Sequence, residues 1–368
     1  PPPPPPPPPP PDCNWTGGKG GVRVDDVNGF TSPPAATRGR RLYALATGGL
    51  LLALSACAEK APQDTMEPAG PVSRKILHLS EPVFLIAGVF LVLIPALVLY
   101  SVLKFRDRPG SPEPQQVHGN TKLEVGWTLI PALILFSIAI PTIKTIFDLS
   151  KKPANALQVT VIGHQFWWEY RYDDLGITTA NELSIVAGQP VELTLESIDV
   201  IHSYWIPPLA GKTDVIPGRQ NHMSFEADKP GTFLGQCTEF CGLSHANMRA
   251  RAVAYTQADF DTWVARQKSA AVTPPAGTEA ADGLALFNGK GCAGCHTVAG
   301  VSQGKVGPDL THLQSRATFA GSIFALNEDN LRTWLENPPA VKPGSVMPDL
   351  GLTEDEITQL IAYLETLQ

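Results

Sequence analysis

The chain has few charged side chains and is poor in the residues that most often bind metals. Charged residues make up 17% of its 368 residues, and the formal net charge is −7. Proteins that bind the phosphates of nucleic acids carry an excess of lysine and arginine, so we expect no nucleic-acid partner. The sequence has only 4 methionines, 6 cysteines and 8 histidines. A metal site would therefore use a large share of them.

These scarce residues gather in one region past the middle of the chain. The stretch G-Q-C-T-E-F-C-G-L-S-H-A-N-M contains Cys237, Cys241, His245 and Met248, and H-S-Y-W-I-P supplies His202 upstream. Sulfur with imidazole, and methionine as a weak axial ligand, favours copper used for electron transfer. Two cysteines one helical turn apart can each bridge two metal ions. This pattern indicates a pair of coppers that share both thiolates. The alternatives are a disulfide and a zinc site, for which methionine is a poor ligand.

A second metal-binding pattern lies near the C-terminus. C-A-G-C-H is the pattern of c-type haem attachment, in which Cys292 and Cys295 bond the porphyrin and His296 ligates the iron. Met347 is the only methionine in this region and the expected sixth ligand, since His/Met ligation raises the haem potential. We expect His312 to be an ordinary surface or loop residue. A bare C-x-x-C would also suit zinc or a redox pair, but the following histidine favours haem.

Two long apolar runs predict membrane-spanning helices. Residues 82–103 and 127–147 each exceed the roughly 20 residues that cross a bilayer core. We therefore expect a transmembrane hairpin over residues 75–150. The connecting loop carries Lys104, Arg106, Arg108 and Lys122, which the positive-inside rule places in the cytoplasm. Basic residues also lie beyond the other ends of both runs, so charge alone is a weak guide. The export signal described below and the copper motif place the C-terminal two-thirds on the outer side of a bacterial cytoplasmic membrane.

The N-terminal segment predicts processing rather than a folded domain. Residues 1–37 begin with a run of prolines and without methionine, and we expect an unstructured stretch from a misassigned start. Residues 38–57 have the basic, apolar and small-residue order of a bacterial lipoprotein signal. Cleavage would precede Cys57, whose sulfur would carry lipid. An ordinary signal peptide with an incidental cysteine is the alternative.

The hydropathy pattern changes after the second apolar run. Residues 156–163, 190–197 and 221–226 alternate with a period near two and are separated by glycine- and proline-containing turns. Short alternating strands of this kind predict an all-β sandwich, which we place at residues 151–265. A Pro/Ala-rich linker follows at residues 266–281.

The last segment, residues 282–368, is expected to be helical. A short helix should precede the haem motif. A final amphipathic helix is indicated by apolar residues at helical spacing, namely Ile357, Leu360, Ile361 and Leu364. Thr353 with Glu356 three residues later predicts a capping box at its start.

The central motifs resemble those of a known family. H-S-Y-W-I-P-P-L-A-G-K-T-D-V-I-P-G-R, with the cysteine stretch after it, is similar to subunit II of the haem–copper cytochrome c oxidases over about residues 75–265. The resemblance implies a Greek-key cupredoxin sandwich and a dinuclear CuA centre. It implies as ligands His202, Cys237, the main-chain carbonyl of Glu239, Cys241, His245 and Met248. The Glu239 carboxylate would face a magnesium or manganese ion shared with subunit I. Residues 282–368 resemble a class I cytochrome c, an all-α fold.

The resemblance also gives a role to the aromatic segment G-H-Q-F-W-W-E-Y. In the family this segment lies over the copper site, and electrons enter through it, which would make Phe166, Trp167 and Trp168 an electron-accepting patch. The residue after G-H-Q is usually tryptophan but here is Phe166. That departure fits a donor tethered to the same chain. We expect His164 to be structural.

Three more residues receive roles by resemblance only. Glu124, before the second apolar run, matches a glutamate at the entrance of a proton path into subunit I. Asp214 and Arg219 would lie near the subunit I interface and its haem propionates.

Together these features predict a membrane-anchored, multidomain subunit II of a caa-type cytochrome c oxidase. It would pass electrons from haem c to CuA and on to subunit I, which reduces oxygen coupled to proton translocation. This chain would be the electron-transfer subunit, since it has no spare histidine cluster for an oxygen site. Expected partners are subunit I, subunit III, membrane lipid, and quinol–cytochrome c reductase or a soluble cytochrome c as donor. The alternatives are the matching subunit of a CuA-type nitric oxide reductase and a membrane-tethered carrier for another acceptor.

Overall fold

The computed structural model describes residues 49, 62–110, 112–113, 115–116 and 118–368. Apart from Gly49, these residues belong to one compact unit, Lys60–Gln368. The predicted N-terminal stretch 1–37, the signal segment 38–57 and the lipidation site Cys57 lie outside the described residues. They stay predictions.

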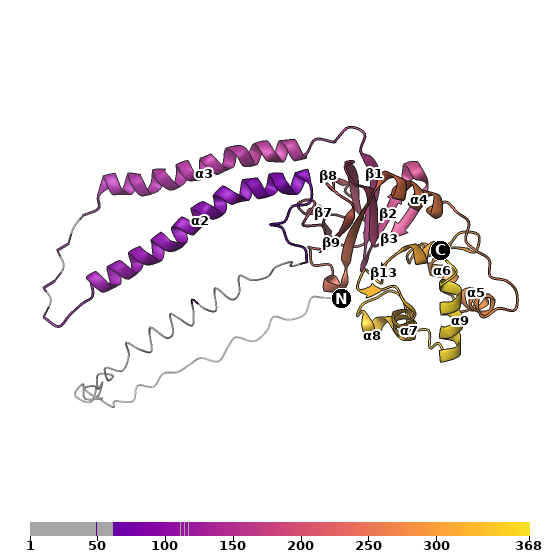
Figure 1. Cartoon of the computed structure of the whole chain (residues 1–368). Coiled ribbons are helices and arrows are strands. Elements are labelled where there is room, and N and C mark those ends of the chain that lie inside the picture. The colour runs from indigo at the N-terminus through magenta and orange to yellow at the C-terminus, as the bar shows by residue number, and fades with distance from the viewer. Residues whose placement is uncertain (1–48, 50–61, 111, 114, 117) are drawn as a thin grey trace, which may run out of the picture. The chain divides into compact units, whose positions relative to one another are not determined.

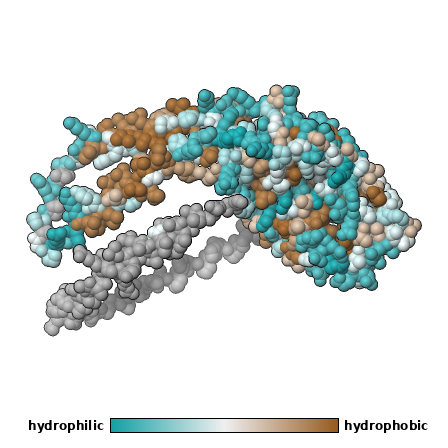
Figure 2. Space-filling model, in the orientation of Figure 1, coloured by the Kyte–Doolittle hydropathy of each residue, from teal (hydrophilic) through white to brown (hydrophobic). Residues whose placement is uncertain are grey.

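Two long helices form the expected hairpin (Figure 1). Helix α2 spans Pro71–Lys104 and helix α3 spans Thr121–Leu149, and both are long and apolar enough to cross a membrane. Their apolar side chains are exposed along their length (Figure 2). The side chain of Asn120 accepts hydrogen bonds from the first amides of α3, which satisfies donors that have no partner inside a helix. Both helices extend beyond the predicted apolar spans into polar flanks.

The segment after the hairpin is a sandwich of two five-stranded sheets. One sheet has the order β3-β2-β1-β5-β8 and the other β4-β10-β9-β6-β7. The strands of the first sheet are β1 Leu157–His164, β2 Trp167–Tyr172, β3 Ile177–Ala180, β5 Val191–Ser197 and β8 Asn221–Phe225. Those of the second are β4 Glu182–Val186, β6 His202–Trp205, β7 Thr213–Val215, β9 Gly231–Cys237 and β10 Arg249–Tyr255. The three strands predicted from alternation are β1, β5 and β8.

The facing sides of the two sheets enclose one apolar core. Its fully buried members include Tyr170 and Leu193 from the first sheet and Leu183 and Tyr204 from the second. Strand β6 pairs with β9, and β9 pairs with β10, all antiparallel. The ends of these three neighbouring strands therefore meet at one edge of the sandwich, where the copper-site residues lie.

Helix α4 (Gln257–Gln267) follows the last strand and packs against β4 and β10. The helical domain begins with α5 (Glu279–Gly289). The stretch without helix between them is therefore shorter than the predicted linker 266–281. The remaining elements are α6 Cys292–Cys295, β11 Thr297–Val298, β12 Ser302–Gln303, β13 Thr318–Phe319, β14 Phe324–Ala325, α7 Glu328–Glu336, α8 Pro338–Val341 and α9 Glu354–Leu364. Short 3-10 turns occur at Asp173–Leu175, His245–Asn247 and Leu313–Ser315.

The last helix forms as predicted. In α9 the Thr353 hydroxyl accepts from the amide of Glu356, and the Glu356 carboxylate accepts from the amide of Thr353, so the capping box is complete. The four apolar residues predicted to share one face are all buried. The predicted fold class, a membrane hairpin with a β-sandwich and a helical cytochrome-like domain, is confirmed.

Candidate metal centres

The copper-site residues come from two strand ends and the loop between β9 and β10. His202 is the first residue of β6, and Cys237 is the last residue of β9. The amide of Cys237 donates to the carbonyl of Met248 at 2.9 Å, so the loop closes on itself at its base. This closure brings Cys241 and His245, which lie within the loop, back to the strand ends.

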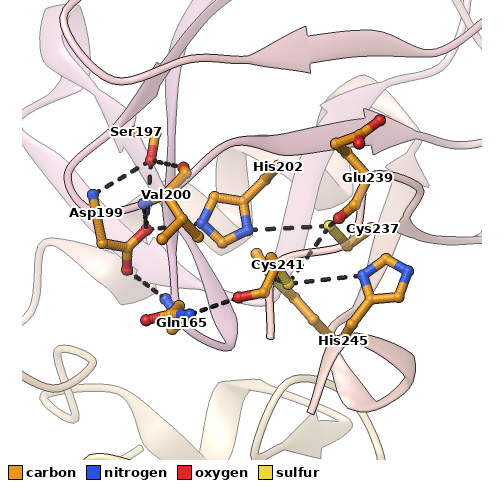
Figure 3. A network of polar contacts seen from close by, with 10 residues as sticks. Gln165, Ser197, Asp199, Val200, His202, Cys237, Glu239, Cys241 and His245 are labelled. Carbon is orange, nitrogen blue, oxygen red and sulfur yellow. Dashed lines mark hydrogen bonds and ion pairs between the residues drawn. The ribbon is translucent and has the colours of Figure 1, made fainter. Parts of the chain in front are cut away.

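The expected side-chain ligands surround the two sulfurs (Figure 3). The Sγ atoms of Cys237 and Cys241 are 3.9 Å apart. Nδ1 of His202 lies 3.9 Å from the Cys237 sulfur, and Nδ1 of His245 lies 3.6 Å from the Cys241 sulfur. The Met248 sulfur is 3.8 Å from the Cys241 sulfur. One imidazole therefore faces each thiol, as a pair of metals sharing both sulfurs requires.

The two thiols influence each other's ionisation. The hydrogen bond with Cys241 lowers the pKa of Cys237, and the same interaction raises the pKa of Cys241. Two like charges at this separation cannot both form without compensation. Metal ions bound to both sulfurs would remove that conflict, because a metal binds the thiolate form. The donor set thus fits copper, and both cysteines are free thiols rather than a disulfide.

Glu239 directs its main chain at the site and its side chain elsewhere. Its carbonyl oxygen is 3.3 Å from the Cys237 sulfur. Its exposed carboxylate points away from the sulfur pair (Figure 3). This arrangement suits the two roles that the resemblance implied, a carbonyl toward copper and a carboxylate toward another ion.

Two residues that the sequence analysis did not identify hold the copper ligands in place. The Asp199 carboxylate lies 2.8 Å from Nε2 of His202, and it also accepts from the amide of Gln165 at 2.6 Å. The Gln165 side chain donates to the carbonyl of Cys241 at 2.5 Å. Burial lowers the pKa of His202, but its hydrogen bonds to Asp199 and Cys237 outweigh that effect, and the net shift is upward. Asp199 lies only three residues before His202, and this short spacing could have indicated from the sequence that the carboxylate contacts the imidazole.

The haem motif forms a short helix beside a buried imidazole. Cys292 and Cys295 begin and end α6, and His296 follows directly. Nδ1 of His296 is 2.8 Å from the carbonyl of Pro308, which leaves Nε2 for iron. Burial lowers the pKa of His296, and this favours the neutral form that a metal ligand needs. A Cβ at Gly307 would lie 2.5 Å from the imidazole, so glycine makes room for the ring.

The residues of the haem motif line a cavity of about 470 Å³, which is within the range of cofactor pockets. Met347 also lines it, and its sulfur accepts a hydrogen bond from the indole of Trp334 at 3.2 Å. Arg316 lines it too and is only 7% exposed, and among the described residues its Nε has no partner. An acidic group of a bound haem would supply one. The cavity therefore fits a haem c held by both cysteines, with His296 and Met347 available to the iron.

The copper domain supplies one wall of this same cavity. Phe166, Trp167, Gln165 and Asp199 line it together with the haem-motif residues. Phe166 lies in the turn between β1 and β2 and is 4% exposed, and Trp167 is 9% exposed. The aromatic patch is thus covered, with the haem cavity beside it. Trp168 is fully buried and contacts the His202 ring edge to face.

Two further histidines are structural in different ways. His164 is buried, stacks on Trp167 and lies 3.2 Å from the Glu169 carboxylate. His312 lies in a turn, as the loop alternative predicted, but it is not on the surface, because it is only 5% exposed. Its Nδ1 lies 2.5 Å from the carbonyl of Gln368, so it fixes the end of the chain. His312 is not among the cavity-lining residues.

The residues assigned by resemblance alone are exposed. Glu124 lies in the first turn of α3, and Asp214 lies on β7. Asp214 and Arg219 line one polar surface hollow next to β8. Their predicted roles at the boundary with subunit I stay predictions.

Family models match three segments of the chain. Residues 59–145 match the transmembrane domain of cytochrome c oxidase subunit II, residues 176–254 its periplasmic domain, and residues 280–368 cytochrome c.

Several curated relatives are similar over most of their length. Cytochrome c oxidase subunit 2 of Alkalihalophilus pseudofirmus is 37% identical over 87% of this chain and 95% of that protein. Cytochrome c oxidase subunit 2 of Bacillus sp. (strain PS3) is 37% identical over 72% of this chain and 80% of that protein. Quinol oxidase subunit 2 of Bacillus cereus is 30% identical over 61% of this chain and 79% of that protein. The chain belongs to the cytochrome c oxidase subunit II family and carries a C-terminal cytochrome c domain.

Proposed function

We propose that the chain is the electron-transfer subunit of a respiratory cytochrome c oxidase. It takes electrons at its own haem c, passes them to its dinuclear CuA centre and delivers them to subunit I, where oxygen is reduced and protons are translocated. The observation that carries this proposal is the shared wall between the two candidate centres. Gln165 and Asp199 line the haem cavity and also hydrogen-bond to copper ligands.

The bound copper and haem would supply one-electron oxidation and reduction. The protein's part is to hold the ligands and exclude water. The Asp199 carboxylate fixes the orientation of His202, as outer-sphere carboxylates do at metal sites. The carbonyl of Pro308 does the same for His296. Full burial of His202 and Met248 keeps solvent away from these two expected copper ligands, so less surrounding water has to reorganise when the charge changes.

The two membrane helices anchor both metal-binding domains at the outer, periplasmic face of a bacterial cytoplasmic membrane. Subunit I and subunit III are the proposed partners within that membrane. The Glu239 carboxylate would ligate a magnesium or manganese ion at the subunit I interface, with Asp214 and Arg219 nearby. The donor would be quinol–cytochrome c reductase or a soluble cytochrome c, delivering electrons to the haem domain.

Oxygen consumption by the purified complex, supplied with reduced cytochrome c, tests this function directly. We expect oxygen uptake sensitive to loss of either metal centre. Reduction of nitric oxide without oxygen uptake would instead favour a nitric oxide reductase. Electron delivery to neither gas would favour a tethered carrier for another acceptor.

The proton-path role of Glu124 needs a separate test. The Glu124→Gln variant keeps the shape of the side chain but cannot exchange a proton at neutral pH. We expect slower oxygen turnover in the assembled complex with unchanged copper and haem spectra. Glu113→Gln, in the loop between the two helices, is the matched control. Full turnover in Glu124→Gln would remove the residue from the proton path.

A further inference from the structure

The haem domain and the copper domain each bury one ionisable side chain against the other. Lys342, at the end of α8 in the haem domain, is 3% exposed, and its ammonium donates to the carbonyl of Phe166 at 2.6 Å. It also donates to the carbonyl of Ala320 in its own domain at 2.7 Å. A buried charge is strongly unfavourable unless hydrogen bonds replace its water. One of the two acceptors of Lys342 exists only when the domains are in contact.

Glu182 is the counterpart on the copper domain. It is the first residue of β4 and is 8% exposed. Both of its carboxylate oxygens lie 3.1 Å from the amide of Ala317, and one accepts from the hydroxyl of Thr318 at 2.7 Å. Both donors belong to the haem domain. Separation of the domains would leave this carboxylate without these partners.

A glycine allows the backbones to approach between these two contacts. Gly321 has a φ of +79°, and a Cβ there would lie 2.7 Å from the carbonyl oxygen of Phe166 and 2.8 Å from that of Asn247. Both oxygens belong to the copper-domain backbone, which cannot move aside as a flexible side chain can. The carbonyl of Gly321 accepts from the amide of Arg249 at 3.0 Å. A residue with a side chain would therefore prevent this contact.

The same contact places the segment that carries Met347 on the copper loop. The hydroxyl of Ser244, next to His245, donates to the carbonyl of Pro343 at 2.6 Å. A Cβ added at Gly242, next to Cys241, or at Gly344 would lie about 3.1–3.2 Å from the Phe166 ring, so the ring packs against both glycines. Phe166 is thus packed between the copper loop and the haem-ligand segment.

We propose that Lys342, Glu182 and Gly321 form a docking clamp that holds the haem domain on the copper domain in the position in which electrons pass between them. This rests on the proposed electron-transfer function. In the docked state the bound haem would supply one electron and be oxidised, and the bound copper pair would accept it and be reduced, with no bond or proton exchanged. Lys342 and Glu182 are positioning residues. Because docking covers Phe166 and Trp167, an external donor must deliver electrons to the haem domain and not directly to copper.

The sharpest test is Gly321→Ala in the assembled oxidase. Its matched control is Gly300→Ala in the same domain, since Gly300 has a φ of +80° and no atom within 4 Å of a Cβ. The two variants share the backbone strain, but only the first meets other atoms, namely the copper-domain carbonyls of Phe166 and Asn247 and the Nζ of Lys342, itself part of the clamp. A second pair is Lys342→Leu with Lys229→Leu, because Lys229 is an exposed lysine on the copper domain. This pair removes the ammonium without changing the backbone.

Two measurements are made on each variant. Hydrogen–deuterium exchange follows peptides containing Arg249 and Ala317, whose amides have acceptors in the opposite domain. The second is the rate of electron transfer from haem to copper after rapid photoreduction. We expect faster exchange at both peptides, and transfer slowed by roughly tenfold or more because the reacting centres are misplaced, in Gly321→Ala and Lys342→Leu only.

Unchanged exchange in both test variants would overturn the clamp. Faster exchange with an unchanged rate of electron transfer would show that electrons do not need the docked position to pass from haem to copper. Failure of the proposed function has a different signature, since the unaltered chain would then move no electrons from haem to copper. In that case the exchange result alone would still decide whether the clamp holds the domains together.

Discussion

The copper site and the haem site hold their histidines by different kinds of contact. His202 is oriented by the side chain of Asp199, whereas His296 is oriented by the main-chain carbonyl of Pro308. The copper ligands also come from separate strand ends, while the haem motif is one short stretch of chain. A site held by side chains can be altered by single substitutions around it. A site held by the backbone responds mainly to changes that displace the backbone or fill its space.

The largest expected effect comes from removing a shared copper ligand. Cys237→Ala should abolish the copper pair, because in the proposed centre both thiolates would be needed to hold the two metals. Copper content should fall to near zero, with covalent haem unchanged, when metal analysis and haem absorption are measured on the same sample. The reciprocal control is Cys292→Ala, which should impair haem attachment and leave copper in place. Loss of haem in Cys237→Ala would mean that the two sites do not form independently.

The next effect tests the backbone-held haem ligand. In Gly307→Ala the new Cβ would lie 2.5 Å from the His296 ring, so the imidazole would have to shift away from the position in which it would ligate the iron. We expect covalent haem with altered axial ligation and a changed midpoint potential, because axial ligands set that potential. Absorption spectra and redox titration measure both. Gly289→Ala is the control, since a Cβ there meets no atom within 4 Å. An unperturbed haem spectrum in Gly307→Ala would contradict the fit.

Local spacing predicted most members of the two candidate ligand sets, and the structure brings these residues together. Their binding of copper and haem stays a prediction. Metal ligands obey short spacings, so the two cysteines, His245 and the haem motif could be recognised from the order of residues alone. The final helix was predictable for a similar reason, since its period and its cap at Thr353 are local features. The strands β1, β5 and β8 were recognised by alternation. The other strands did not offer so clear a pattern, as in β4, where all five residues are buried.

Contacts between distant segments were not predictable in this way. Lys342 reaches the carbonyl of Phe166 across 176 residues of sequence, and nothing near either residue indicates that contact. The burial of His312 likewise depends on its contact with Gln368, which lies 56 residues further along the chain. Such contacts follow from the packing of whole domains, which a single sequence does not specify through local patterns.

A smaller effect is expected at the side-chain support of the copper site. Asp199→Asn keeps the size of the side chain but removes the charge that orients His202. Loss of such outer-sphere partners typically costs about 10–100-fold in metal affinity or activity, and we expect a loss in this range. Copper competition with a chelator measures it. Asp174→Asn, on the exposed turn before β3, is the control. Equal copper affinity in Asp199→Asn would show that the backbone alone orients His202.

The smallest expected effect is on the thermal stability of each domain, not on its metal site. Thr353→Ala removes the capping box of α9, which should lower haem-domain stability by about 1 kcal/mol. Thr256→Ala removes the cap of α4, where the threonine side chain accepts from the amide of Asp259, and should act on the copper domain instead. Thermal unfolding followed at the haem band and at the copper band distinguishes them. Each substitution should shift mainly its own transition, because the two apolar cores are separate. If Thr353→Ala shifted both transitions equally, the domains would unfold as one cooperative unit, and docking would contribute as much to stability as either core.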